Sequence, residues 1–142
     1  MSGLCFEDLE IGRAAERTTL VTQALIEAFA SVSGDRNPVH LDVDYAQATP
    51  FKGVIAHGML SAALISAILG MDLPGPGAIY LSQSLTFKRP VRPGDEIIAQ
   101  AEVTALDAEK ARATLRTTCT VAGNVVVEGE AVVMVPRKDA AA

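Results

Sequence analysis

One stretch determines how this chain folds: Gly53-Val-Ile-Ala-His-Gly-Met-Leu-Ser-Ala-Ala-Leu-Ile-Ser-Ala-Ile-Leu-Gly-Met71. It contains no Asp, Glu, Lys or Arg, so it is the segment best suited to burial. Its length approaches that of a membrane span. However, it includes His57, Gly58 and two serines, and its flanks show no marked positive-charge asymmetry. A helix that is apolar on all sides is also typical of a protein core. We therefore expect a buried helix over Gly58 to Leu69, ended by Gly70, and no contact with a membrane.

Downstream of this helix, apolar residues recur at every second position, which is typical of half-buried strands. Four such runs follow the loop Pro74 to Gly77, and short turns at Asp107 to Lys110 and at Ala122 to Asn124 join the last three as antiparallel hairpins. The apolar face of these strands needs a cover, and the apolar helix is the one element suited to it. The prediction is a single α+β domain over residues 1–142, an antiparallel sheet wrapped around a central buried helix, with a frayed tail over 137–142.

A shorter helix is expected upstream, with Thr22 as its N-cap and Gly34 at its C-terminal end. Asn-Pro favours turn initiation, so we expect a turn over Asp35 to Pro38 and then a polar, irregular region over Asp42 to Lys52. The apolar stripe of the helix consists of Leu25, Ile26, Phe29 and Val32.

Composition argues against several classes of protein. The formal net charge of −5 disfavours a nucleic acid partner, because phosphate backbones require a basic face. Cys5 and Cys119 are too few for a disulfide framework and lack metal-ligand spacing, so we expect buried or incidental thiols. The N-terminal residues show no basic region leading into an apolar segment. We expect a cytoplasmic protein that binds no metal.

One carboxylate and one imidazole, those of Asp35 and His40, lie close together in the segment Ser33 to His40. A carboxylate and an imidazole that converge on one water molecule can remove a proton from it and direct it at an electrophile. The residues alone leave other roles open. Asp35 can act as a turn residue that bonds its own backbone, and His40 can be a structural histidine. Turn chemistry at Asn37 is compatible with both interpretations.

The start of the apolar helix offers a second half of a site. A helix N-terminus presents unpaired N–H groups and partial positive charge, and Gly58 lets a ligand approach the backbone closely. Such an amide can stabilise the oxyanion that forms on a thioester carbonyl. Gly58 can equally begin a helix in crowded packing, and His57 can cap or pack there. A buried Ser66 needs a hydrogen-bond partner, either a carbonyl of its own helix or the Asp35 carboxylate.

The segment Lys88 to Asp95 holds the main basic cluster of this acidic chain, formed by Lys88, Arg89 and Arg92. These side chains can meet the phosphates of an acyl carrier such as coenzyme A. They can also belong to a solvated turn. The residues alone leave both interpretations open.

Three motifs resemble those of the MaoC-like, (R)-specific enoyl-CoA hydratases, and the chain looks most similar to the short PhaJ-type members. The motifs are Ser33 to His40 (SGDRNPVH), Ile55 to Leu60 (IAHGML), and Tyr80 to Phe87 with Pro90 to Asp95. Their order and spacing agree with the family from about Phe6 to Val135. The first motif is specific, whereas the later ones are shared more loosely across hot-dog folds.

The resemblance implies a hot-dog fold, a homodimer with a joined sheet, and reversible hydration of trans-2-enoyl-CoA to (R)-3-hydroxyacyl-CoA. In this family the reaction links fatty acid β-oxidation to polyhydroxyalkanoate synthesis and needs no metal or redox cofactor, since coenzyme A is part of the substrate. Carried over by position, Asp35 and His40 form the catalytic pair, Ser66 orients Asp35, and the Gly58 N–H is the oxyanion donor. The candidate substrate-binding residues are Asn37, which shapes the catalytic loop, His57, Leu69 and Met134 for the acyl pocket, and Arg89.

Other activities occur on the same fold. Some hot-dog proteins hydrolyse acyl-CoA thioesters, and others dehydrate substrates carried on acyl carrier protein. A non-catalytic acyl-CoA-binding dimer is a third possibility, but a binder has no need of the acid–base pair Asp35 and His40. A thioesterase releases free thiol and a hydratase does not, so the alternatives are separable by assay. Acyl chain length is left open by the sequence.

Overall fold

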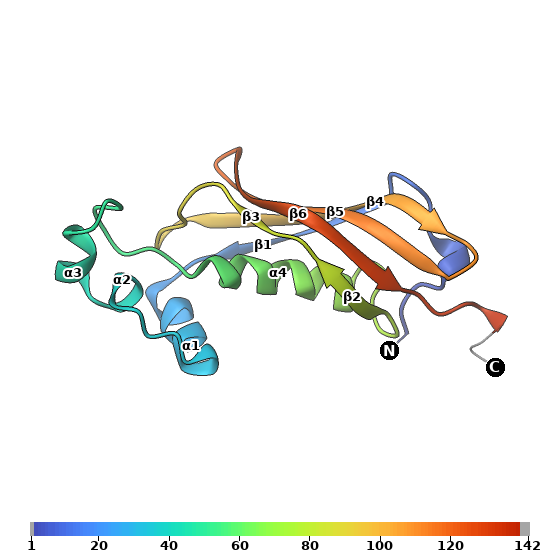
Figure 1. Ribbon diagram of the computed structural model, residues 1–142, viewed down its shortest axis with the longest axis horizontal. Helices are drawn as coiled ribbons and strands as arrows, with labels where there is room; N and C mark the ends of the chain where they lie inside the picture. Colours follow the sequence, from blue (N-terminus) through green and yellow to red (C-terminus); the bar gives the residue numbers. More distant parts are fainter. Residues whose placement is uncertain (1, 140–142) are drawn as a thin grey trace.

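The apolar stretch forms helix α4 (Gly58–Met71), which lies across one face of a curved antiparallel sheet (Figure 1). The coordinates are a computed structural model that describes residues 2–139. The strands lie in the order β1-β4-β5-β6-β2, and β3 also pairs with β6. This arrangement confirms the predicted sheet around a central helix. The strands are β1 (Ala14–Leu20), β2 (Ile79–Gln83), β3 (Thr86–Phe87), β4 (Glu96–Asp107), β5 (Arg112–Val121) and β6 (Asn124–Met134), and a 3₁₀ helix, η1, covers Phe6–Asp8.

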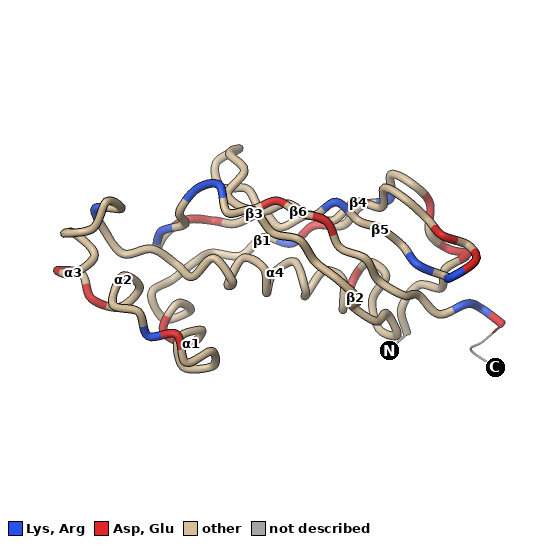
Figure 2. Tube along the Cα trace, in the orientation of Figure 1, with Lys and Arg blue, Asp and Glu red and all other residues tan. Residues whose placement is uncertain are grey.

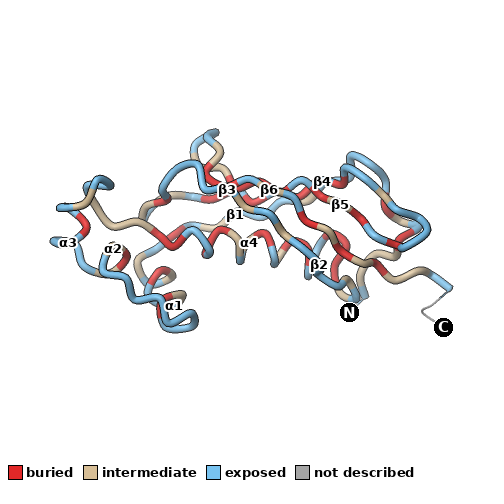
Figure 3. The backbone as a smooth tube through the Cα atoms, viewed as in Figure 1, coloured by how far each residue is buried: buried red, intermediate tan, exposed pale blue. Residues whose placement is uncertain are grey.

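Helix α4 packs against the sheet with one face only. The buried side chains of this face, which join the inward-facing side chains of β4, β5 and β6 in one core, are Leu60, Ser61, Ile65, Ile68 and Leu69. The opposite face is exposed and consists of Met59, Ala63, Ser66 and Gly70 (Figure 3). The helix also continues past Leu69 through Gly70. The expectation of a helix buried on all sides is therefore wrong for the exposed face of this protomer. None of the helices within residues 2–139 has the length and hydropathy needed to cross a bilayer.

Helix α1 (Gln23–Ser33) begins and ends as predicted. Thr22 Oγ1 accepts a hydrogen bond from the Leu25 N–H at 3.0 Å, and Gly34 ends the helix with φ of 79°, where a glycine carries no Cβ penalty. The predicted apolar stripe is wrong at Val32, whose side chain is 88% exposed. The face that packs against the rest of the protein instead contains Ile26 and Ala30.

The predicted turn at Asp35 is present, but two short helices lie after it where the sequence indicated no regular structure. They are α2 (Pro38–Leu41) and α3 (Val43–Gln47), capped by the side chains of Asn37 and Asp42 respectively. Such short helices carry too little periodicity to be recognised in a sequence. With α1 they group at the end of the molecule where α4 begins (Figure 1), so this segment holds the candidate catalytic loop beside the start of α4.

The described part of the C-terminal segment is anchored rather than frayed. Arg137 lies over the ring of Phe6 at 5.5 Å and donates a hydrogen bond to the Glu109 carbonyl at 3.2 Å. Lys138 forms an ion pair with Asp8 at 3.0 Å. The predicted tail is therefore wrong for 137–138, and its last part, 140–142, lies outside the described residues.

Both cysteines are free thiols, in agreement with the prediction. Cys119 lies in the core, and burial raises the pKa of its thiol to about 12. The thiolate is the reactive form, so this cysteine is unreactive at neutral pH.

Candidate active site

The loop after α1 is built from consecutive side chain-to-backbone hydrogen bonds. The Asp35 N–H donates to Ser33 Oγ at 3.1 Å, and Asp35 Oδ1 accepts from the Asn37 N–H at 3.1 Å. Asn37 Oδ1 in turn accepts from the Val39 N–H at 3.2 Å as it caps α2. Asp35 is thus a turn residue, as one of the open interpretations held. Its side chain is exposed and its second carboxylate oxygen is left for other partners.

His40 is buried and its ring orientation is fixed. Nδ1 lies 2.7 Å from the carbonyl oxygen of Ile55, and since a carbonyl only accepts, Nδ1 carries the proton. In the neutral ring Nε2 then holds the lone pair. The backbone is held as well, because Gln23 Nε2 donates to the His40 carbonyl at 3.0 Å. His40 therefore offers a basic nitrogen of defined direction.

The two candidate catalytic side chains converge, together with a third. Ligand-type atoms of Asp35, His40 and His57 all lie within 4.8 Å of one another. His57 Nε2 lies 2.9 Å from the Asp35 carbonyl oxygen, and the His40 and His57 rings stack with centroids 3.8 Å apart. The sequence placed Asp35 and His40 in one loop, whereas the contacts of His57 with both come only from the folded chain.

This cluster suits hydrogen bonding better than metal binding. The His40 and His57 rings are inclined by only 27°, so their in-plane lone pairs lie in nearly parallel planes. The ligands of a metal ion instead point at one common centre. The carboxylate and the two imidazoles are therefore poorly arranged as three ligands of one ion, while a carboxylate and an imidazole at this spacing can share a water molecule.

Gly58 is the first residue of α4, so its N–H has no acceptor inside the helix. A Cβ at this position would lie 2.6 Å from Cε1 of Phe87, which confirms the crowded packing considered for this glycine. His57, the N-cap, directly precedes it. The contacts of the His57 ring therefore place the start of α4 beside Asp35 and His40.

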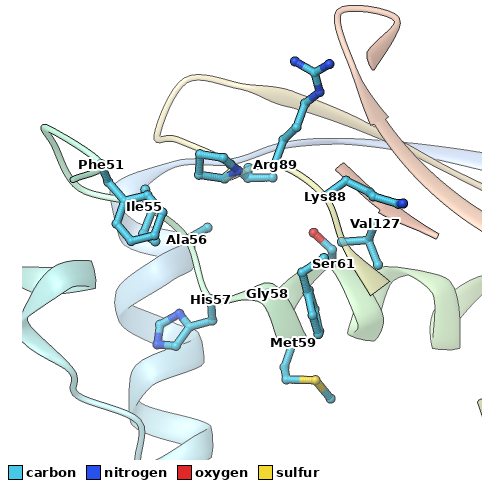
Figure 4. A pocket seen from close by; sticks show the side chains of 13 residues that line it. Phe51, Ile55, Ala56, His57, Gly58, Met59, Ser61, Lys88, Arg89 and Val127 are labelled. Carbon is cyan, nitrogen blue, oxygen red and sulfur yellow. The ribbon is translucent and has the colours of Figure 1, made fainter. Parts of the chain in front are cut away.

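A cavity of about 480 Å³ opens beside Gly58 (Figure 4). Its lining is mostly apolar, and Lys88 and Arg89 lie at one side. The Ser61 hydroxyl points into it, while the His57 ring turns away from Ser61 and Lys88. Sequence analysis missed Ser61, although its position three residues after Gly58 places both on the same helix face. The apolar lining comes from Phe51, Ile55, Ala56, Met59, Phe87, Pro90, Val91 and Val127.

The three basic residues near this cavity differ in their contacts. Lys88 forms an exposed ion pair with Glu128 at 3.3 Å, and Arg92 donates to the carbonyl of Phe51. Within residues 2–139 the Arg89 side chain forms neither an ion pair nor a hydrogen bond. Its guanidinium points away from Gly58 and Ser61 (Figure 4). Figure 2 shows these basic residues at the end of the sheet near the start of α4. Arg89 is therefore the one of the three whose charged group has no partner within residues 2–139.

Three other predicted site residues lie elsewhere. Ser66 borders a second cavity, of about 530 Å³, between α1, α4 and β2, and within residues 2–139 no hydrogen bond joins it to Asp35. Leu69 packs in the core, and Met134 ends β6 opposite Ile79 and Arg112. Neither Leu69 nor Met134 borders the two cavities, because Leu69 faces the sheet and Met134 lies at the far end of α4 from Gly58.

The chain is similar in sequence and in fold to known proteins. A family model described as MaoC-like domain matches residues 8–130. The (R)-specific enoyl-CoA hydratase of Rhodospirillum rubrum is 57% identical over 94% of this chain and 92% of its own length, and that of Aeromonas caviae is 50% identical over 92% and 98%. The solved structure of R-hydratase PhaJ1 from Pseudomonas aeruginosa, in the unliganded form, superposes with a TM-score of 0.91 at 48% identity and covers 96% of this chain and 88% of that one.

Proposed function

The chain belongs to the MaoC-like domain family, and we propose that it is an (R)-specific enoyl-CoA hydratase, a hydro-lyase with the hot-dog fold. Relatives with this name are 50–57% identical over almost its whole length. The observation within the structure that carries the proposal is the convergence of the Asp35 carboxylate and the His40 imidazole next to the start of α4. The reaction is reversible addition of water to trans-2-enoyl-CoA, giving (R)-3-hydroxyacyl-CoA.

In the proposed mechanism, Asp35 and His40 hold one water molecule between them. His40 Nε2 is the atom suited to take a proton, because Nδ1 donates to Ile55. The oxygen of the water adds to C3 of the enoyl group, and the pair delivers a proton to C2 on the same face. A positioned acid–base pair of this kind contributes roughly 10²- to 10⁴-fold to the rate.

The thioester carbonyl is placed at the N-terminus of α4. C3 is electrophilic only when negative charge can build on the carbonyl oxygen. The Gly58 N–H, free of a helical acceptor and backed by the helix dipole, is the proposed donor to that oxygen. One such donor contributes about 3 kcal/mol to transition-state stabilisation. Asn37 shapes the loop by capping α2. Ser66 lines the second cavity and is not hydrogen-bonded to Asp35 within residues 2–139.

The alternatives separate in one assay with crotonyl-CoA. Loss of the conjugated enoyl-thioester absorbance without thiol release supports the hydratase. Equimolar thiol release identifies a thioesterase. Turnover of the acyl-carrier-protein substrate alone identifies a carrier-protein dehydratase, and binding without turnover of any enoyl thioester identifies a binding protein.

The mechanism requires no metal or redox cofactor. A backbone amide stabilises the negative charge on the carbonyl oxygen, and side chains transfer the protons. We therefore expect hydratase activity to stay within about 20% of its starting value after dialysis against EDTA, because fixed hydrogen-bond donors, not a metal ion, stabilise the charge. Loss of activity that added Zn²⁺ restores would assign a metal to the cluster instead.

Arg89 is proposed to meet a phosphate of coenzyme A at the rim of the cavity beside Gly58. We expect Arg89→Ala to raise KM for crotonyl-CoA by roughly 3- to 10-fold with little change in kcat, because an exposed contact of this kind contributes about 0.7–1.4 kcal/mol. Arg92→Ala is not a matched control, since Arg92 holds the Phe51 loop. Lys110→Ala, distant in a β-turn, serves as the control, and an unchanged KM for Arg89→Ala would exclude this contact.

A homodimer with a joined sheet is proposed from the exposed apolar surface of the protomer. β2 is an edge strand whose Ile79, Tyr80 and Leu81 are 54%, 40% and 40% exposed, and the small-residue face of α4 lies beside it. Exposed apolar side chains grouped on an edge strand are typical of an interaction site. Sedimentation equilibrium should give twice the 14.9 kDa of the chain, and a monomer at micromolar concentration would contradict the dimer.

The biological setting stays a prediction. Because the proposed product has the (R) configuration, we propose that it supplies polyhydroxyalkanoate synthesis from β-oxidation in the cytoplasm. Deleting the gene should lower polymer accumulation from fatty acids and leave accumulation from sugars unchanged. Cell fractionation would test the location.

A further inference from the structure

His57 contacts both candidate catalytic residues and also lines the cavity beside Gly58, with its ring directed away from Ser61 and Lys88 (Figure 4). It is 3% exposed, and its backbone forms the N-cap of α4. Its ring contacts three residues that lie far from His57 in the sequence. These contacts are to the Asp35 carbonyl, to the His40 ring, and to the Phe29 ring at a centroid distance of 4.9 Å.

The hydrogen bond of the His57 ring fixes its tautomer. The Asp35 carbonyl oxygen, 2.9 Å from Nε2, only accepts, so Nε2 carries the proton. In the neutral ring Nδ1 then holds a lone pair, and this atom is buried without a partner among the described residues. A buried acceptor without a donor is unfavourable, and an apolar side chain here would avoid it. The stabilising contribution of the imidazole must therefore come from its other nitrogen and from its faces.

One face of the His57 ring restricts the orientation of His40. His40 is held in its own plane by the hydrogen bond from Nδ1 to Ile55, and the stacked His57 ring blocks motion perpendicular to that plane. With both directions restricted, the Nε2 lone pair of His40 keeps one direction. The Nε2–H of His57 meanwhile holds the backbone of Asp35, whose carboxylate is already tied to the Asn37 N–H.

We propose that His57 is a positioning residue that sets the Asp35 carboxylate and the His40 Nε2 relative to the Gly58 amide, through its hydrogen bond to the Asp35 carbonyl and its stack on His40. The proposal rests on the proposed hydratase function and gives His57 a positioning role beside its predicted role in binding substrate, since it also lines the cavity. Since a misplacement of about 1 Å costs roughly 100-fold in rate, loss of this contact should lower kcat rather than raise KM.

Two substitutions separate the two contacts through which His57 positions the site. His57→Gln places an amide N–H at the reach of Nε2 but loses the stack on His40, whereas His57→Phe keeps the stack and loses the donor. Each variant keeps only one of the two contacts, so we expect kcat for crotonyl-CoA to fall about 10- to 100-fold in both, with KM within about threefold. A wild-type kcat in His57→Phe would show that His57 only packs, and a wild-type kcat in His57→Gln would show that the stack does not position His40. Ile65→Val, a buried change in the same helix, is expected to lower Tm with kcat unchanged.

A second measurement does not depend on activity. The chain has two histidines, so the ¹⁵N spectrum of histidine-labelled protein shows four ring nitrogens, and His57→Gln assigns them by subtraction. At neutral to alkaline pH we expect the protonated nitrogen to be Nε2 in His57 and Nδ1 in His40. A proton on Nδ1 of His57 would overturn the proposal. If wild-type protein fails to hydrate crotonyl-CoA while this pattern is found, the proposed function fails and the hydrogen bond to Asp35 stands.

Discussion

Asp35→Asn is expected to lower kcat for hydration of crotonyl-CoA by roughly 10²- to 10⁴-fold, the usual contribution of a positioned acid–base group. Asparagine forms the same kind of turn as aspartate, so the hydrogen bond from the Asn37 N–H to the side-chain oxygen can persist. The substitution therefore removes the negative charge and the proton-accepting oxygen while keeping the loop. Steady-state kinetics give kcat, and calorimetry with butyryl-CoA, which lacks the double bond, should give a Kd within about threefold of wild type.

Asp42→Asn provides the matched control. Asp42 lies in the same segment and accepts from the Tyr45 N–H at 3.1 Å as the cap of α3, a role that asparagine fills equally well. Its kcat should equal that of wild type. Full activity in Asp35→Asn would remove this carboxylate from the mechanism, and equal losses in both variants would point to a general effect of charge.

Gly58→Pro is expected to lower kcat/KM by about 10²- to 10³-fold relative to Gly58→Ala, because only proline removes the proposed oxyanion donor. Proline is tolerated at the first position of a helix, where the N–H has no helical acceptor. The preceding His57 has φ −60° and ψ 136°, which a residue before proline readily adopts. Both variants add a Cβ against Phe87, so their comparison cancels that crowding.

Circular dichroism and Tm identify any variant in which α4 has been disturbed. The test is informative when the two Gly58 variants melt within a few degrees of each other. If neither folds, Phe87→Ala supplies room in both, since Phe87 is 53% exposed. Equal kcat/KM values in the Pro and Ala variants would show that another group stabilises the carbonyl oxygen.

The main elements of the fold were predictable because their signals are local and strong. The apolar stretch marked α4, and alternation marked β4, β5 and β6. Thr22 and Gly34 predicted the two ends of α1. The helices α2 and α3 were missed because four and five residues show no usable periodicity. Hydropathy also failed to show that Val32 and the Ser66 face of α4 are exposed, since exposure depends on which neighbours the fold supplies.

The candidate site was predictable in part. Asp35 and His40 lie only five residues apart, so a sequence motif places them together, and Gly58 follows from its position at a helix start. The contact of His57 with Asp35 spans 22 positions in the chain and arises only when α4 meets α1 and α2. Acyl-pocket positions such as Leu69 and Met134 depend on the same tertiary detail, and neither borders the two cavities described above.

Hydration of crotonyl-CoA in D₂O, followed by determination of the configuration at both new centres, tests the central claim most directly. Delivery of water and proton by Asp35 and His40 from one face should give (R)-3-hydroxybutyryl-CoA with one deuterium at C2, added on the same face as the hydroxyl, and no free thiol. The (S) product would contradict the (R)-specific assignment, and deuterium added on the opposite face would contradict one acid–base pair that supplies both the water and the proton.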